Sequence, residues 1–370
     1  MPPLTPARRR KPAAAKPATA KPAAAKPLAA PPAPPITVTV YFATNRKKSV
    51  AGAAGYGDKI ILNDPAGVVY AVAEVTGTDL NAEDSGSITR VLNSANGDFL
   101  PAVKNQILAK KKNLLIFIHG FANSFSDGIK RAAFNREWFA ASGVAAADTT
   151  VIAFSWPSTG QVVALPPHMP TDDYFADQTR AGQSGLHLAH FLKNMDALIK
   201  QFRAQNANGR AFLLAHSMGN YALQSAVQFY FGMGGPVRVI FDEVILPAAD
   251  ERYDTFLRPA GGRFSNLHKL TRRITTYCNE HDAPLNLATG LNLKQRLGLD
   301  GPKDKDDVTK YPVSTYRLVE ITKVKDYDPL HPLDASHQYY RRSKKARADI
   351  AAVMGGTATP PGGDIKLKTP

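Results

Sequence analysis

The sequence predicts a three-layer α/β domain, with helices on both faces of a mostly parallel sheet. One observation is a series of short, almost wholly apolar runs, a pattern typical of strands that are buried on both faces. These runs cover residues 114–118, 151–154, 211–214, 239–246, 274–277 and 316–321. The other observation is that helical patterns fall between several of the runs. Such alternation favours right-handed crossovers between parallel strands.

The clearest helical pattern lies between residues 188 and 202. Its apolar residues are spaced by four, three, four and three positions, and they are Leu188, Leu192, Met195, Ile199 and Phe202. That spacing places one apolar stripe on a helix, which Asn208-Gly209 ends. Residues 127–140 and 221–231 are predicted to form shorter helices.

The globular part begins at residue 36 with an extended segment. Residues 36–42 (ITVTVYF) are β-branched and aromatic, and further extended stretches follow at 59–62 and 68–75. Together they predict an antiparallel start to the sheet. We therefore expect one α/β domain over residues 36–354, followed by a flexible Gly/Pro-rich tail over 355–370.

Residues 1–35 differ sharply from this domain. They hold seven of the 46 basic residues and none of the 31 acidic ones, and a Lys-Pro step recurs every five residues from Lys11. Such a segment cannot bury enough apolar surface to fold, so we predict a disordered arm with polyproline II character. Its basic residues, spread over 8–26, could contact a polyanion such as nucleic acid or anionic lipid, or the arm could be a solvating spacer.

Composition excludes several classes of protein. The single cysteine, Cys278, excludes a disulfide framework and a cysteine-rich metal site, and we expect it to be a small buried residue. No apolar run reaches the roughly 18 residues that a membrane helix needs, and the basic N-terminus precedes no apolar signal core, so we expect a cytoplasmic protein. No phosphate loop, metal-ligand spacing or dinucleotide fingerprint is found, so no cofactor or metal is expected.

The run from 211 to 220 reads as a buried strand, a tight turn and a helix. Ser217 lies on the turn, with the small residues Ala215 and Gly219 two positions away on either side. This is the pattern of a nucleophile elbow, where a bulky neighbour would collide with the bent backbone. A serine that only caps the helix would not need small residues on both sides. His216 is expected to point away from the serine and to pack.

An earlier strand, 114–118, runs into His119-Gly120-Phe121. Glycine there lets the backbone approach the serine, so that the N–H groups of Phe121 and Met218 can hold a developing oxyanion.

Several separated motifs, in this order along the chain, resemble the DUF900 family of α/β-hydrolase-fold proteins, serine esterases of bacteria. They are residues 41–46 (YFATNR), 115–125 (LIFIHGFANSF), 154–158 (FSWPS), 215–220 (AHSMGN) and 337–339 (HQY). The resemblance covers most of residues 38–350 and implies the α/β-hydrolase fold and a serine nucleophile. It implies no particular substrate.

Hydrolases of this fold supply the acid and then the histidine after the serine. His337 follows the last strand and matches the family's His-x-Tyr element, and His331 is the alternative base. For the acid we favour Asp282, just beyond the 274–277 strand, where the resemblance also places it. Asp250, after the preceding strand, is its rival.

Trp156, Tyr174 and Phe125 are expected to line or brace an acyl pocket, although core packing is an open alternative for each. The sequence thus predicts a cofactor-independent serine hydrolase that acts on a small-molecule carboxylic ester. The alternative is a catalytically silent binding or scaffold protein that the basic arm recruits to a polyanion.

Overall fold

The computed structural model describes residues 34–49, 55–61, 64, 67–77, 86–109, 112–140, 148–159, 163–164, 167–168, 170–257, 263–326, 336–358 and 364–367. From Pro35 onward these residues belong to one compact unit. The predicted basic arm lies outside the described residues except for its last two positions, and so does His331. Within the described part, no helix has the length and apolar character needed to cross a membrane.

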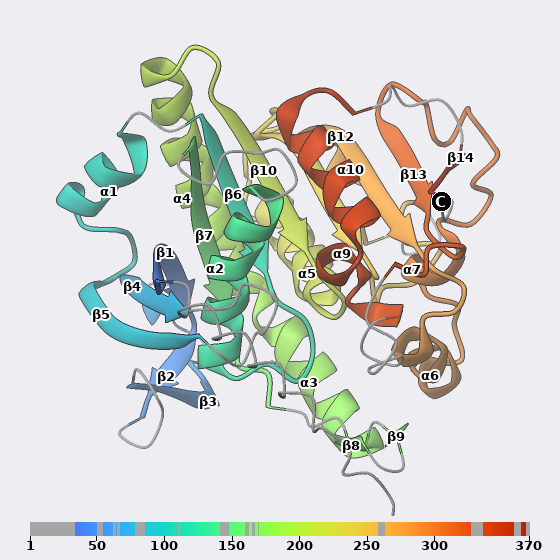
Figure 1. Ribbon diagram of the computed structural model, residues 1–370, viewed down its shortest axis with the longest axis horizontal. Helices are drawn as coiled ribbons and strands as arrows, with labels where there is room; N and C mark the ends of the chain where they lie inside the picture. Colours follow the sequence, from blue (N-terminus) through green and yellow to red (C-terminus); the bar gives the residue numbers. More distant parts are fainter. Residues whose placement is uncertain are drawn as a thin grey trace, which may run out of the picture. The chain divides into compact units, whose positions relative to one another are not determined.

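One large sheet runs through the compact unit (Figure 1). Its order in the described residues is β14-β13-β12-β11-β10-β6-β7-β1-β4-β5. The strands are β1 (Ile36–Thr44), β4 (Val69–Gly77), β5 (Ser87–Asn96), β6 (Asn113–Ile118), β7 (Thr149–Ser155), β10 (Arg210–Ala215), β11 (Phe241–Pro247), β12 (Thr271–Cys278), β13 (Tyr316–Glu320) and β14 (Asp364–Lys366). Neighbours from β14 to β1 pair in parallel, whereas β1, β4 and β5 pair antiparallel. The predicted α/β fold with an antiparallel N-terminal part is confirmed.

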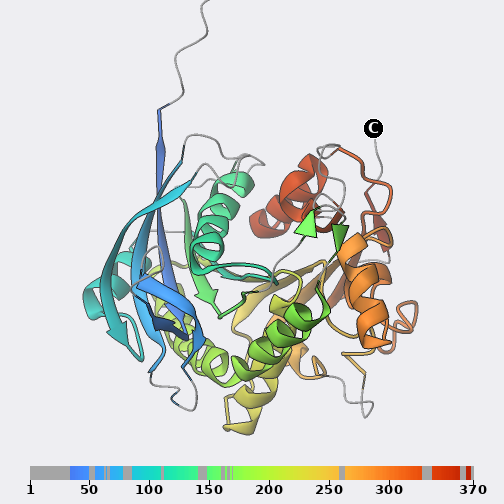
Figure 2. The ribbon, with the colours of Figure 1, turned by 90° about the horizontal axis from the view of Figure 1, so that it is seen from below.

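Helices cover both faces of the sheet (Figures 1 and 2). They are α1 (Pro101–Leu108), α2 (Phe125–Ala140), α3 (Thr171–Gln183), α4 (Gly185–Gln205), α5 (Gly219–Gly232), α6 (Ala283–Asn292), α7 (Leu297–Asp300), α9 (Tyr339–Arg342) and α10 (Lys344–Gly355). Alternate residues of β6 enter two different cores: Leu114 and Ile116 join the stripe of α4, while Leu115 and Phe117 join α2 and α10. Burial on both faces explains why the strand is apolar throughout.

One expectation about strands was wrong, and one strand was missed. Lys59 and Ile60 do not extend the main sheet, because β3 (Tyr56–Ile60) pairs with β2 (Arg46–Lys48) in a small separate sheet, and Leu62 lies outside the described residues. The third antiparallel strand is instead β5, whose side chains are mostly exposed and give little apolar signal.

The C-terminal segment also differs from the expected flexible tail. The helix α10 ends at Gly355, and Gly356 takes the left-handed conformation (φ 75°) that suits a helix terminus. Residues 364–366 then form β14, which pairs in parallel with β13, and Ile365 packs against the core. The prediction was wrong here, since these residues cover an otherwise open sheet edge.

The carboxyl ends of the parallel strands β6, β10, β11 and β12 lie side by side. Loops that leave the carboxyl ends of parallel strands converge, and this is where sites form in α/β proteins.

Candidate active site

Ser217 lies on a sharp turn between β10 and α5. Its φ is 53°, in the left-handed region that non-glycine residues rarely adopt. The turn presses on the end of β6, because a Cβ added at Gly219 would lie 2.6 Å from the His119 carbonyl oxygen. The local geometry is that of a nucleophile elbow, as the small residues around the serine predict.

His337 connects this serine to a carboxylate. Its Nε2 lies 2.8 Å from Ser217 Oγ, and its Nδ1 lies 2.9 and 2.8 Å from the two oxygens of Asp282. A carboxylate only accepts hydrogen bonds, so Nδ1 carries the proton and donates it to Asp282. Nε2 is then free to accept the Ser217 hydroxyl proton. The structure therefore joins the three predicted residues in one hydrogen-bonded chain.

Asp282 is fixed from two sides. It is the N-cap of α6, where its Oδ1 accepts the N–H of Leu285 at 3.0 Å. It is fully buried, and burial raises the pKa of its carboxyl, while the adjacent His337 and these hydrogen bonds oppose that rise.

Asp250, the rival acid, lies elsewhere. Its carboxylate accepts the Tyr174 hydroxyl at 2.9 Å and lies 3.3 Å from Arg296 Nε. Among the described residues it contacts no histidine side chain. Its backbone N–H donates to Ser217 O at 3.2 Å. Asp250 therefore packs against the elbow, but its carboxylate is not part of the hydrogen-bonded chain from Ser217 to Asp282.

The loop that carries His337 is held by residues that the sequence did not mark. Asn279 Nδ2 donates to Ser336 O at 2.9 Å. His216 packs against the ring of His337, at 4.8 Å between centroids, with its Nε2 3.2 Å from His337 O. Burial holds the pKa of His216 well below its ordinary value, so its neutral ring donates from Nε2.

Tyr339 ties the ends of two strands to this loop. Its hydroxyl accepts the Ala248 N–H at 2.6 Å, beyond β11, and donates to Tyr277 O at 2.9 Å, in β12. Tyr339 is the tyrosine of the His-x-Tyr element, two residues after His337. The sequence marked this tyrosine as part of the motif but did not reveal what it contacts.

The candidate oxyanion donors lie on either side of the serine. A Cβ added at Gly120 would lie 2.8 Å from Ser217 Cβ, which shows how closely the loop approaches. In the described part of the chain, the N–H groups of Phe121 and Met218 donate to no protein acceptor. Both amides are therefore available to a ligand beside Ser217.

The three aromatic residues expected at an acyl pocket have different places. Tyr174 lies beside the candidate oxyanion donor Phe121, with 6.1 Å between the two ring centroids. Trp156 is fully buried and braces the loop by donating from Nε1 to His119 O at 2.8 Å. Phe125 packs against Phe42 and Tyr56 in the core on the α2 side, so its expected place at the pocket was wrong.

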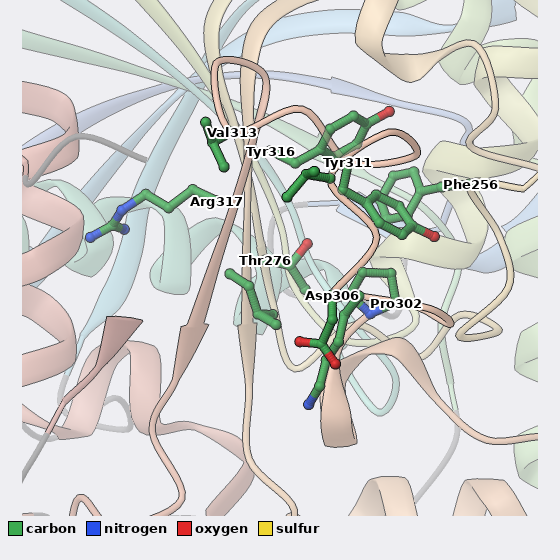
Figure 3. A pocket seen from close by; sticks show the side chains of 11 residues that line it. Phe256, Thr276, Pro302, Asp306, Tyr311, Val313, Tyr316 and Arg317 are labelled. Atoms are coloured by element: carbon green, nitrogen blue, oxygen red, sulfur yellow. The ribbon is translucent and has the colours of Figure 1, made fainter. Parts of the chain in front are cut away.

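A separate cavity of about 180 Å³ lies at β12 and β13 (Figure 3). The rings of Phe256, Tyr311 and Tyr316 lie together on one side, and Arg317 points away from them. None of the residues that form the Ser217–His337–Asp282 chain lines this cavity. Across the described residues, no three His, Cys, Asp or Glu side chains converge as metal ligands would.

Comparisons with known proteins bear on the family. No curated protein matches the chain. Among solved structures, it is similar to a C6-C4 SN3 inhibited esterase B from Lactobacillus rhamnosis, with 13% identity, a TM-score of 0.30, and coverage of 81% of this chain and 85% of that chain. A family model described as "Alpha/beta hydrolase of unknown function (DUF900)" matches residues 99–344, more than half of the sequence. The chain therefore belongs to the DUF900 family of α/β hydrolases.

Proposed function

We propose that the protein is a serine hydrolase that cleaves a carboxylic ester through an acyl-enzyme intermediate. The observation that carries this proposal is the continuous chain from Ser217 Oγ through His337 to Asp282, with heavy-atom distances of 2.8 and 2.8 Å. A serine hydroxyl is a weak nucleophile until an adjacent base removes its proton, and this chain supplies that base with its tautomer fixed.

The first half-reaction forms a bond between Ser217 Oγ and the acyl carbon. His337 Nε2 accepts the hydroxyl proton as this bond forms, and Asp282 stabilises the resulting imidazolium. The carbonyl oxygen becomes an oxyanion, which the N–H groups of Phe121 and Met218 hold. His337 then donates its proton to the leaving alkoxide oxygen, the ester C–O bond breaks, and an alcohol departs.

The second half-reaction uses the same groups on water. His337 Nε2 accepts a proton from a water molecule, whose oxygen attacks the acyl carbon of the Ser217 ester. Collapse of the second tetrahedral intermediate returns the proton to Ser217 Oγ and releases the carboxylic acid. No residue beyond these is needed for a balanced cycle.

Turnover of p-nitrophenyl esters of increasing acyl length tests this proposal. We expect the wild type to release p-nitrophenol and Ser217→Ala to lose at least about 10⁴-fold in kcat, because the nucleophile is gone. Ser225→Ala is the matched control. The Ser225 hydroxyl donates to Gly182 O, at 3.0 Å, and takes no part in the Ser217–His337–Asp282 chain. Wild-type turnover in Ser217→Ala would contradict the proposal, and the profile over acyl length would report pocket depth.

A further inference from the structure

A buried cation lies beneath the oxyanion loop, residues 119–123. Arg46 is 1% exposed, and its guanidinium donates only to neutral oxygens. These are Ser155 Oγ at 3.1 Å, Gly57 O at 3.1 Å, Asn123 O at 2.8 Å and Ser158 O at 3.4 Å. Within the described residues, no carboxylate lies within 4 Å of it. Burial lowers the pKa of Arg46 to about 10, which leaves it charged at neutral pH.

A buried charge with no carboxylate in direct contact is costly, and such groups gather at functional sites. Asp177, Asp58 and Asp127 stabilise the Arg46 charge only from beyond 4 Å. The groups that accept hydrogen bonds from the Arg46 guanidinium therefore indicate its role. Two of its four acceptors, Asn123 O and Ser158 O, belong to the oxyanion loop or to the segment that supports it, and Ser158 Oγ accepts the Asn123 N–H at 3.2 Å.

The contact with Ser155 begins a directional chain of hydrogen bonds. Arg46 Nε can only donate, so Ser155 Oγ accepts from it, and the Ser155 hydroxyl proton is left for His119 Nε2 at 3.4 Å. His119 is neutral, because burial and Arg46 lower its pKa to about 3. Its remaining proton must then lie on Nδ1, which is 3.0 Å from Gly120 O.

A second donor reaches the same carbonyl. Asn123 Nδ2 lies 3.0 Å from Gly120 O and 2.7 Å from Phe121 O. Gly120 O and the Phe121 N–H belong to one planar peptide and point in opposite directions. The two donors on the oxygen, His119 Nδ1 and Asn123 Nδ2, therefore fix the direction of the N–H, which points away from them. The close approach of Gly120 to Ser217 shows that the serine lies against this peptide.

We propose that Arg46, Ser155, His119 and Asn123 are positioning residues that set the orientation of the Phe121 N–H as an oxyanion donor. The inference rests on the proposed serine hydrolase function and adds to it a mechanism of preorganisation. It also explains a pattern in the sequence. Three motifs far apart along the chain, residues 41–46, 115–125 and 154–158, supply these four side chains to one place.

Arginine is required at position 46 because its fork donates in several fixed directions at once. A lysine keeps the charge but presents a single ammonium, which cannot reproduce the Nε and Nη2 contacts together. The inference thus predicts that Arg46→Lys and Arg46→Gln lose catalysis to a similar degree.

The test compares ester kinetics with inhibitor affinity in the full chain. We expect both Arg46 variants to lower kcat by about 10- to 100-fold and to change KM by less than about threefold, because the donor acts on the oxyanion. The affinity for a trifluoromethyl ketone, which forms a hemiketal oxyanion on Ser217, should fall in proportion to kcat/KM. Arg317→Gln is the matched control: Arg317 is equally buried, but its guanidinium pairs with Asp349 at 2.6 and 2.8 Å.

A milder variant gives an independent readout. Nitrogen-15 NMR of the His119 ring should show one tautomer, protonated at Nδ1, in the wild type and a mixture in Ser155→Ala.

If Arg46→Gln keeps wild-type kcat and ketone affinity while Ser217→Ala is inactive, the inference is overturned and the proposed function stands. Rescue by Arg46→Lys would also overturn it, since charge alone would then suffice.

Discussion

Asp250 and Asp282 occupy corresponding places at the ends of two neighbouring strands. Asp250 comes shortly after β11 and Asp282 shortly after β12, and both carboxylates are buried. Asp282 meets the ring of His337 at 2.8 Å, whereas Asp250 meets Tyr174 and Arg296. The local sequence around the two acids does not reveal this difference, because a distant segment supplies each partner.

The partners fit the proposed catalytic role of Asp282 and a structural role for Asp250. Asp282 faces an imidazole whose other nitrogen reaches Ser217, so the carboxylate can stabilise a transient positive charge. Asp250 faces the guanidinium of Arg296, which is buried as well. Two aspartates at equivalent strand ends thus differ in role because the fold places a different partner, His337 or Arg296, beside each carboxylate.

The largest expected effect comes from Asp282→Asn. The asparagine oxygen can still cap α6, but its amide no longer enforces the Nδ1–H tautomer of His337. We expect kcat for a p-nitrophenyl ester to fall by about 10⁴-fold with little loss of stability. Steady-state kinetics and thermal unfolding measure the two quantities. Unchanged turnover would transfer the role of the catalytic acid to Asp250.

Asp250→Asn should have the opposite profile. It leaves the Arg296 guanidinium buried without its carboxylate, which costs about 3 kcal/mol in the free energy of unfolding. We expect kcat of the folded protein to stay within a few-fold of the wild type. Urea unfolding and ester turnover provide the data, and a 10³-fold loss of kcat in a stable variant would disprove the structural role.

A matched control is Asp196→Asn. Asp196 pairs with Arg238 at 2.5 Å, but the Arg238 side chain is 43% exposed. Because water screens an exposed pair, this variant should lose less than about 1 kcal/mol.

Glu251, next to Asp250, should make the free energy of unfolding depend on pH. Its carboxyl is fully buried, and burial raises its pKa to about 7. Between its ordinary pKa of 4.5 and about 7, the folded protein binds more protons than the unfolded chain at this group, so its contribution to stability falls as pH rises. Wild type should lose about 2 kcal/mol across this window relative to Glu251→Gln. Urea unfolding at pH 5 and pH 8 measures the difference; parallel pH profiles would argue against a titrating Glu251.

The sequence predicted those features that local patterns encode. The buried strands showed as apolar runs, and the elbow at Ser217 showed as a serine between small residues. The strand β5 gave little signal because most of its side chains face solvent, and β14 is only three residues long. Phe125 was misplaced because an apolar residue that starts a helix can enter either core.

The positioning network was beyond local patterns altogether. Arg46 lies 77 residues from Asn123 and 109 from Ser155 along the chain. Only the folded sheet, in which β1 pairs with β7, brings these motifs together. Tyr339 is a similar case, since its hydroxyl joins the ends of β11 and β12 across long separations.

Covalent modification by a fluorophosphonate reports directly on whether Ser217 is an activated nucleophile. In this reaction Ser217 Oγ forms a bond to phosphorus and fluoride leaves, provided that His337 accepts the hydroxyl proton. Intact-protein mass spectrometry should show one adduct on the wild type, and peptide mapping should place it on Ser217, with no adduct on Ser217→Ala. A folded wild-type protein that stays unmodified, or one modified at another residue, would show that Ser217 is not the nucleophile.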